Sequence, residues 1–124
     1  MHNDMTPEGW KLVSAEGRNA EYPSTFLIPS RDEREALVPG DGAKLLFDIQ
    51  TSENGIVMER MWVIVKSRTE EDYIGVLDSD PVSIREFGPH TGESITFRPE
   101  HIASISSPPR EYVIDKYGVS FFGE

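Results

Sequence analysis

The sequence predicts a mainly β domain: a small bent sheet or an SH3-like β-barrel, with one short helix and a C-terminal β extension. Residues 56–105 contain β-prone runs separated by short polar turns, which is typical of an antiparallel meander. Residues 44–50 alternate between apolar and polar side chains, the pattern of a half-buried strand. A length of 124 residues fits a single domain. A meander this short has to bend to enclose a core. A split barrel or an OB-like barrel is the second choice.

Residues 1–40 are expected to be an N-terminal segment that carries the short helix. Its first half is polar and contains several glycines and prolines, so we expect it to be partly irregular. Trp10–Val13 would form a short strand or a cover over the barrel. Ser30 and Glu33 have the spacing of a capping box, in which each side chain accepts a hydrogen bond from the other residue's backbone. This predicts a helix of one or two turns that ends after Leu37, ahead of a Pro-Gly pair.

Residues 41–106 are expected to form the β-barrel core. In its first strand, alternation places three apolar side chains toward the interior: Leu45, Phe47 and Ile49. Only Leu46 interrupts that pattern. An Asn-Gly pair at 54–55 predicts a hairpin turn into a long strand over 56–67.

The rest of the core is expected to return in shorter strands. Gly75 lies inside one of them and indicates a bulge or a bend of the barrel. Pro99–His101 predicts a tight turn, after which residues 102–105 form a final short strand. Residues 107–124 are expected to add a C-terminal hairpin or an edge strand.

The charge of the chain restricts its partners. There are 22 acidic residues against 12 basic ones, a net charge of −10. An acidic surface repels phosphate backbones and anionic lipids, so neither nucleic acid nor a membrane is an expected partner. The charge favours either a basic partner protein or simple solubility. The absence of cysteine excludes disulfides and thiolate metal sites, and together with the absence of a signal-peptide pattern it favours the cytoplasm. The oligomeric state is left open.

Several of these residues follow a recurring order. A glutamate precedes Met-Trp-Val, a glycine lies in the next strand, an aspartate-proline loop follows, and a Gly-Glu pair precedes a phenylalanine: Glu59, Met61, Trp62, Val63, Gly75, Asp80, Pro81, Gly92, Glu93 and Phe97. Over residues 40–105 the chain therefore resembles the bacterial family catalogued as domain of unknown function 2314. The resemblance implies a small module that occurs alone or beside other domains, sometimes in settings suggestive of toxin immunity. It implies no particular chemistry.

The long strand over 56–67 offers the candidate binding surface. Its outer face would be amphipathic, and with the adjacent acid it supplies the candidate binding residues: Glu59, Arg60, Trp62, Ile64 and Lys66. Trp62 is either partly exposed or covered by the N-terminal segment near Trp10. Aromatic and arginine side chains dominate the binding energy of protein interfaces, so this face favours a non-catalytic protein-interaction module. An immunity-type protein that neutralises a basic toxin is one alternative.

Signs of catalysis are sparse. The chain contains no nucleophile motif, no phosphate-binding glycine loop and no zinc-protease motif, so no catalytic residue, cofactor or metal site is predicted. A small ligand-binding barrel or an enzyme remains a second alternative. It would use Glu59, His90 and His101, provided that these three residues lie around one pocket.

Overall fold

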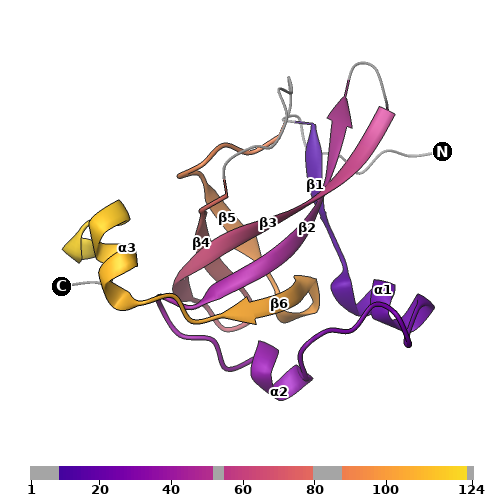
Figure 1. Ribbon diagram of the computed structural model, residues 1–124, viewed down its shortest axis with the longest axis horizontal. Helices are drawn as coiled ribbons and strands as arrows, with labels where there is room; N and C mark the ends of the chain where they lie inside the picture. The colour runs from indigo at the N-terminus through magenta and orange to yellow at the C-terminus, as the bar shows by residue number, and fades with distance from the viewer. Residues whose placement is uncertain (1–8, 52–54, 80–87, 123–124) are drawn as a thin grey trace.

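The structure is a computed structural model that describes residues 9–51, 55–79 and 88–122. In these residues six strands form one antiparallel sheet in the order β1-β2-β3-β4-β5, with β6 also paired to β2 (Figure 1). The strands are β1 (Trp10–Val13), β2 (Gly42–Thr51), β3 (Gly55–Arg68), β4 (Tyr73–Leu77), β5 (Ser94–Phe97) and β6 (Ile102–Ser106). The sheet curls into a half-barrel, so the prediction of a mainly β domain with a bent sheet is confirmed. Residues Asn54, Asp80 and Pro81, which the sequence assigned to turns, lie outside the described residues.

Strand β2 is the centre of the fold because both of its edges are paired. β3 runs along one edge over residues 42–51, while β6 and β1 share the other edge at residues 42–45 and 46–49. The predicted inward side chains of β2 are fully buried in the main core: Leu45, Phe47 and Ile49. Leu46, which interrupts the alternation, is buried on the opposite face against Ala15 and Ala103. The interruption therefore marks a strand that is covered on both faces.

The sheet bends where β3 meets β4. The register shifts between Val65 and Ser67, which leaves Lys66 as the extra residue of a β-bulge. Gly75 pairs with Val65 at this point, and a Cβ on Gly75 would lie 2.4 Å from the Val63 side chain and 2.7 Å from the Ile64 carbonyl oxygen. The absence of a side chain thus permits the close approach of the two strands, as the glycine predicted.

The predicted turn at Pro99–His101 is present as a short 3₁₀ turn, η1, which leads directly into β6. The predicted capping box is also present: Ser30 begins α2 (Arg31–Arg34), with Glu33 as its reciprocal partner. This helix ends earlier than expected, and Leu37 is buried in the main core beyond it.

Two helices were not predicted. Residues expected to be irregular form α1 (Ala15–Glu21), which Ser14 caps by accepting the backbone N–H of Gly17. The predicted C-terminal hairpin or edge strand is wrong: the tail forms α3 (Arg110–Tyr117) and a 3₁₀ turn, η2 (Val119–Phe122). α1 and α3 lie at opposite ends of the long axis of the molecule (Figure 1). Of the helices in the described part of the chain, none combines the length and apolar character that crossing a bilayer requires.

A candidate binding groove beside Trp62

On the outer face of β3, Trp62 has a neighbour on each side that contacts another part of the chain. Toward one end the guanidinium of Arg60 lies 5.6 Å from the centre of the Phe26 ring, in the segment between α1 and α2. Toward the other end Ile64 is only 3% exposed, because Val113 and Phe121 of the C-terminal segment pack on it. Trp62 lies between these two positions and is half-buried.

A groove of about 400 Å³ opens beside Trp62. It lies between the sheet, the end of β6 and α3, and its lining residues are Trp62, Ile64, Asp78, Ser106, Ser107, Pro108 and Tyr112. The large side chains of this set are apolar or aromatic, and the small ones are serines. Such a mixture of aromatic contact area with a few polar groups is what binding sites commonly use.

The position of the indole ring is fixed by its neighbours. The backbone N–H of Trp62 donates to the Ser79 hydroxyl, with 2.6 Å between nitrogen and oxygen. Lys44 pairs with Trp62 across β2 and β3, and its ammonium nitrogen lies 5.1 Å from the centre of the indole. Because a cation over an aromatic face is attracted to it, Lys44 favours one orientation of the ring.

Asp78 holds α3, which forms part of the groove, in place against the sheet. Its carboxylate accepts hydrogen bonds from the hydroxyls of Tyr112 (2.8 Å) and Tyr117, and it pairs with the Lys116 ammonium at 3.0 Å. Burial alone would raise the pKa of Asp78, but the hydrogen bonds from Tyr117, Tyr112 and Lys116 outweigh burial and hold that pKa below its ordinary value. The same contact raises the pKa of Lys116 and of Tyr112. α3 is therefore attached to the end of β4 by one carboxylate with three donors.

The structure does not gather the five predicted binding residues into one surface. Trp62 and Ile64 line the groove, while Arg60 and Lys66 are exposed on either side of it. Glu59 pairs with Phe47 and shares the face of the sheet that carries the main core.

The sequence left two alternatives for Trp62, partial exposure or a cover by the N-terminal segment near Trp10. Trp10 does not cover Trp62. Its ring packs on Phe47 in the main core, with 5.6 Å between the ring centres. The wall residues Asp78, Ser107, Pro108 and Tyr112 were missed as binding residues. One signal for the helix that carries Tyr112 was the Pro-Pro pair at 108–109, because prolines can precede a helix as well as end a strand.

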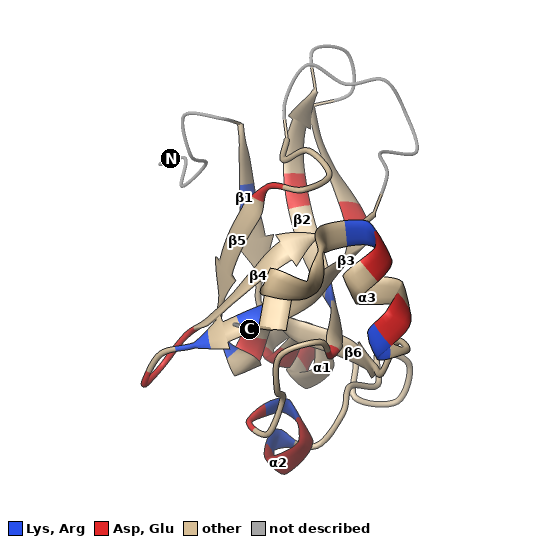
Figure 2. Ribbon diagram, turned by 90° about the vertical axis from the view of Figure 1, so that its left-hand side faces the viewer, with Lys and Arg blue, Asp and Glu red and all other residues tan. Residues whose placement is uncertain are grey.

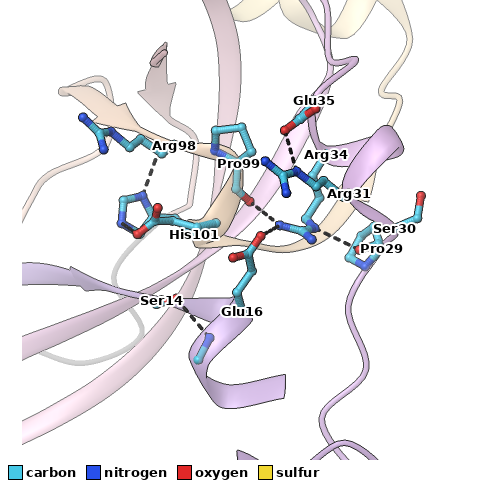
Figure 3. Close-up of polar contacts among 12 residues, drawn as sticks. Ser14, Glu16, Pro29, Ser30, Arg31, Arg34, Glu35, Arg98, Pro99 and His101 are labelled. Carbon is cyan, nitrogen blue, oxygen red and sulfur yellow. Dashed lines mark hydrogen bonds and ion pairs between the residues drawn. The ribbon is translucent and has the colours of Figure 1, made fainter. Parts of the chain in front are cut away.

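A second polar cluster ties the N-terminal segment to the core (Figure 3). Arg34 is only 6% exposed, and its Nη1 donates to a Glu16 carboxylate oxygen at 2.6 Å and to the Pro99 carbonyl at 3.1 Å. Its Nε donates to the Pro29 carbonyl at 2.9 Å. One buried guanidinium thus joins α1, the start of α2 and η1.

A charged bowl of about 330 Å³ lies in the same region of the fold. Its lining residues are Glu16, Arg31, Glu35, Arg68, Glu70, Glu71, Arg98, Pro99 and Glu100. Each arginine already has a partner: Arg31 pairs with Glu35 at 2.9 Å, Arg98 pairs with Asp72 at 3.1 Å, and Arg68 donates to the Glu35 carbonyl. The pKa values of Arg31 and Arg98 are raised by these contacts. With its cations engaged, the bowl presents a mainly acidic rim.

The residues proposed for a ligand site or an enzyme lie outside the groove beside Trp62 and outside the charged bowl. Glu59 and His101 lie on opposite sides of β2, because Glu59 is in β3 and His101 is in η1, directly ahead of β6. His101 Nδ1 accepts the Arg98 backbone N–H at 2.9 Å, and burial lowers the pKa of His101. His90 is exposed and its backbone N–H donates to Glu93. None of the three residues lines the groove or the bowl. Within the described ranges, no three potential metal ligands of the His, Cys, Asp or Glu type come together.

Comparison with known proteins identified no relative of this chain. A scan against protein-family models found no match, and searches of the curated proteins and of the solved structures returned no similar protein.

Proposed function

We propose that this protein is a non-catalytic protein-interaction module that holds a segment of a partner protein in the groove beside Trp62. The observation that carries the proposal is the half-buried indole at the floor of an open, mostly apolar groove with an aromatic rim at Tyr112. Tryptophan and tyrosine supply much of the binding energy at protein interfaces, because they bury a large area with few rotatable bonds.

The shape of the groove favours a polypeptide over a small molecule. Its lining comes from the sheet, at Trp62, Ile64 and Asp78, and from one continuous stretch of chain that runs from the end of β6 into α3. A site open along its length suits an extended segment, whereas small-molecule sites enclose most of their ligand. The order of a meander, a 3₁₀ turn and a strand that returns to β2 also supports an SH3-like form of the half-barrel.

The charge of the chain favours a basic partner. With a net charge of −10, the protein attracts basic partners from a distance and repels acidic ones. Figure 2 shows acidic and basic residues together on α2 and α3, so the excess of negative charge does not lie on these two helices. The resemblance to domain of unknown function 2314 supports the same kind of module, and this module would act inside the cytoplasm.

A specific version of the proposal is an immunity-type protein that covers a basic toxin. The observation that favours it is the acidic rim of the charged bowl, where Glu70 and Glu100 belong to no ion pair with an arginine or lysine among the described residues. In this version the partner would contact the rim as well as the groove, and its binding would weaken steeply with salt.

The test is affinity capture from the native host, with the wild-type chain, Trp62→Ala and Tyr22→Ala as bait at low and at high salt. Tyr22 is 52% exposed at the end of α1, so its substitution removes an exposed aromatic ring outside the groove. We expect one stoichiometric partner that wild type and Tyr22→Ala retain and Trp62→Ala loses. Circular dichroism of all three proteins establishes that they are folded.

Two results would contradict the proposal. One is the capture of the same proteins by all three baits, which would place binding away from Trp62. The other is the absence of any stoichiometric partner at low salt. Loss of the partner in high salt alone, with Trp62→Ala still active, would favour the acidic rim over the groove.

A further inference from the structure

Two basic side chains beside the groove have no carboxylate partner in the described part of the chain. The ammonium nitrogen of Lys44 lies 5.1 Å from the centre of the Trp62 indole, and the guanidinium carbon of Arg60 lies 5.6 Å from the centre of the Phe26 ring. Neither cation forms an ion pair there. In a chain with 22 acidic residues and 12 basic ones, two neighbouring cations that contact aromatic rings instead of carboxylates call for an explanation.

The register places these two cations next to each other on the outer face of the sheet. Lys44 is directly opposite Trp62, and Arg60 precedes Trp62 by two residues on β3, so all three side chains point to the same face. Diagonal neighbours of this kind are about 7–8 Å apart, within reach of long side chains. Of the two acidic residues in β2 and β3, Asp48 shares this face, whereas Glu59 points to the face of the main core. The local charge around Trp62 is therefore opposite in sign to the net charge of the chain.

Gly42 places Lys44 next to the groove. A Cβ on Gly42 would lie 2.3 Å from the Ser106 hydroxyl oxygen and 3.5 Å from Cε3 of Trp62, so Gly42 lies between two residues of the groove lining. Lys44 is the next residue of β2 on the same face, roughly 7 Å further along the strand. A segment that contacts Trp62 in the groove can therefore reach the Lys44 ammonium with a side chain one or two residues away.

We propose that the partner segment in the groove carries an acidic side chain close to an apolar one, and that Lys44 and Arg60 bind its carboxylate. This rests on the proposed function, in which the groove holds a polypeptide. The apolar side chain contacts Trp62, and the carboxylate provides the ion pairs that the two cations lack within the described chain. The acidic residue also sets the direction of the segment, because the reverse orientation would bring its carboxylate toward Asp78, which lines the groove.

A partner that is basic as a whole can meet this requirement. The net charge of −10 acts on the whole partner as it approaches. Lys44 and Arg60 act on one residue that is already in contact, since salt screens charges over about 8 Å. A basic protein whose bound segment contains one aspartate or glutamate therefore satisfies both conditions.

Single-stranded nucleic acid is a poorer occupant than a polypeptide. Aromatic rings beside cations do occur where proteins bind single strands. Such binding needs several cations along the phosphate backbone, whereas here Asp48 lies on the same face and Asp78 lines the groove. The net charge of −10 also repels every phosphate. These observations favour a single carboxylate on a polypeptide.

The test uses synthetic peptides of the form acetyl-Gly-X-Gly-Leu-Phe-Gly-amide, in which X is glutamate, glutamine or lysine. Because both ends are capped, the side chain of X is the only charged group that differs. Nuclear magnetic resonance follows the indole N–H of Trp62 and the Nε–H of Arg60 during each titration. We expect the glutamate peptide to shift both signals and to bind about fivefold more tightly than the glutamine peptide. The lysine peptide should bind most weakly.

Two double variants locate the carboxylate contact. Lys44→Gln with Arg60→Gln removes the proposed partners, and Lys11→Gln with Lys66→Gln removes two cations that do not line the groove. Both double variants change the net charge equally, so long-range attraction is matched. The first should bind the glutamate and glutamine peptides with equal affinity, whereas the second should keep the preference of about fivefold. Each preference is measured within one protein, so a difference in stability between the variants does not alter it.

Each failure has its own signature. If wild type binds the glutamate peptide no more tightly than the glutamine or lysine peptide, while Trp62 still shifts, the carboxylate contact is overturned and the proposed function stays intact. If both double variants keep the preference, or both lose it, the role of Lys44 and Arg60 is overturned. If no peptide shifts the Trp62 signal at millimolar concentration, the proposed function is overturned as well. Tighter binding of single-stranded oligothymidine than of the glutamate peptide would assign this face to nucleic acid and would also overturn both.

Discussion

Arg34 and Pro99 are 65 residues apart in the chain, yet the guanidinium of one donates to the carbonyl of the other at 3.1 Å. The same guanidinium also holds Glu16 and the carbonyl of Pro29 (Figure 3). The N-terminal segment is therefore joined to the half-barrel by a buried cation with specific geometry as well as by apolar contact. Burying a charge is unfavourable unless it is paired and hydrogen-bonded, and here both conditions are met.

Replacing Arg34 should loosen this junction. We expect Arg34→Met to lower the free energy of unfolding by about 2 kcal/mol, because two carbonyls lose their donor at a buried position and Glu16, whose side chain is 47% exposed, loses its partner. Arg34→Lys should recover little of this loss, since an ammonium cannot reproduce the fork of donors. Urea unfolding measures both variants. If Arg34→Lys were as stable as wild type, a positive charge at this position would be enough to hold the junction, and the fork of donors would not be needed.

Two glycine substitutions should have opposite effects. In Gly75→Ala the new Cβ would meet the Ile64 carbonyl oxygen at 2.7 Å, so the two strands must separate and stability should fall by about 2 kcal/mol or more. In Gly17→Ala the Cβ meets only Ser14 at 3.5 Å, inside a helix. Alanine should there be neutral or should stabilise by up to about 1 kcal/mol. Thermal unfolding of the pair is the measurement, and equal midpoints would contradict the explanation of the bend.

Removing the charge of Asp78 should release α3. Asp78→Asn weakens hydrogen bonds from Tyr112 and Tyr117 and the pairing with Lys116. We expect a loss of about 2 kcal/mol of local stability, confined to α3 and η2. Amide exchange should therefore rise in α3 while β2 stays protected. Equal acceleration in both elements would mean that α3 unfolds only together with the sheet.

The effect of Asp78 should also depend on pH. Because the folded-state pKa of Asp78 is lowered, its stabilisation is complete above its ordinary pKa of 3.8 and is lost as pH falls through the folded value. Wild type and Asp78→Asn should thus differ at neutral pH and converge in acid. A constant difference across this range would contradict a role for the carboxylate charge.

His101 should make the fold sensitive to mild acid. Burial lowers its pKa below the ordinary 6.5, so at pH values below 6.5 the unfolded chain binds the proton more readily than the folded chain. Stability should be complete above pH 6.5 and should fall as pH drops through the folded-state pKa. Protonation of Nδ1 would also remove the acceptor for the Arg98 N–H.

The matched variant is His101→Asn, whose side-chain oxygen can still accept that N–H. Urea unfolding from about pH 7 to about pH 5 should show a smaller loss of stability in the variant than in wild type. Parallel curves would assign the acid sensitivity to other groups. Wild type and His101→Asn contain the same carboxylates, so the difference between their two stability curves reports the titration of His101 alone.

The strands could be predicted because their signals are local. Alternation in β2, the glycine of the β3–β4 bend and the turn at Pro99 each reflect the environment of the residues that carry them. The capping box of α2 is local in the same sense. These elements were predicted correctly.

The two missed helices depend on partners elsewhere in the chain. α1 mixes alanine and glutamate with glycine and asparagine, and α3 mixes charged helix formers with tyrosine, valine and isoleucine, so intrinsic preference decided neither helix. What stabilises α3 is the burial of Val113 against Ile64 and the anchor at Asp78. Gly118 has a φ of 92° and ends α3, as glycines commonly end helices. Gly118 and the prolines before Arg110 were therefore the sequence signals for a helix between them.

The groove escaped prediction for the same reason. Trp62 was identified from the alternation of β3, but its neighbours Asp78 and Tyr112 lie 16 and 50 positions further along the sequence, as their numbers show. Only a tail that folds as a helix brings Tyr112 to Asp78. Because we expected the tail to be a strand, no sequence pattern placed Tyr112 beside Asp78.

The separate packing of α3 has a consequence for how this protein can change. Ile64, Val113 and Phe121 form a small apolar cluster of their own, distinct from the core around Phe47. One wall of the groove can therefore acquire new side chains at its exposed positions, such as Tyr112, without disturbing the half-barrel. A lineage of such proteins could exchange one recognised segment for another by altering its tail, while the sheet that keeps the chain folded stays as it is.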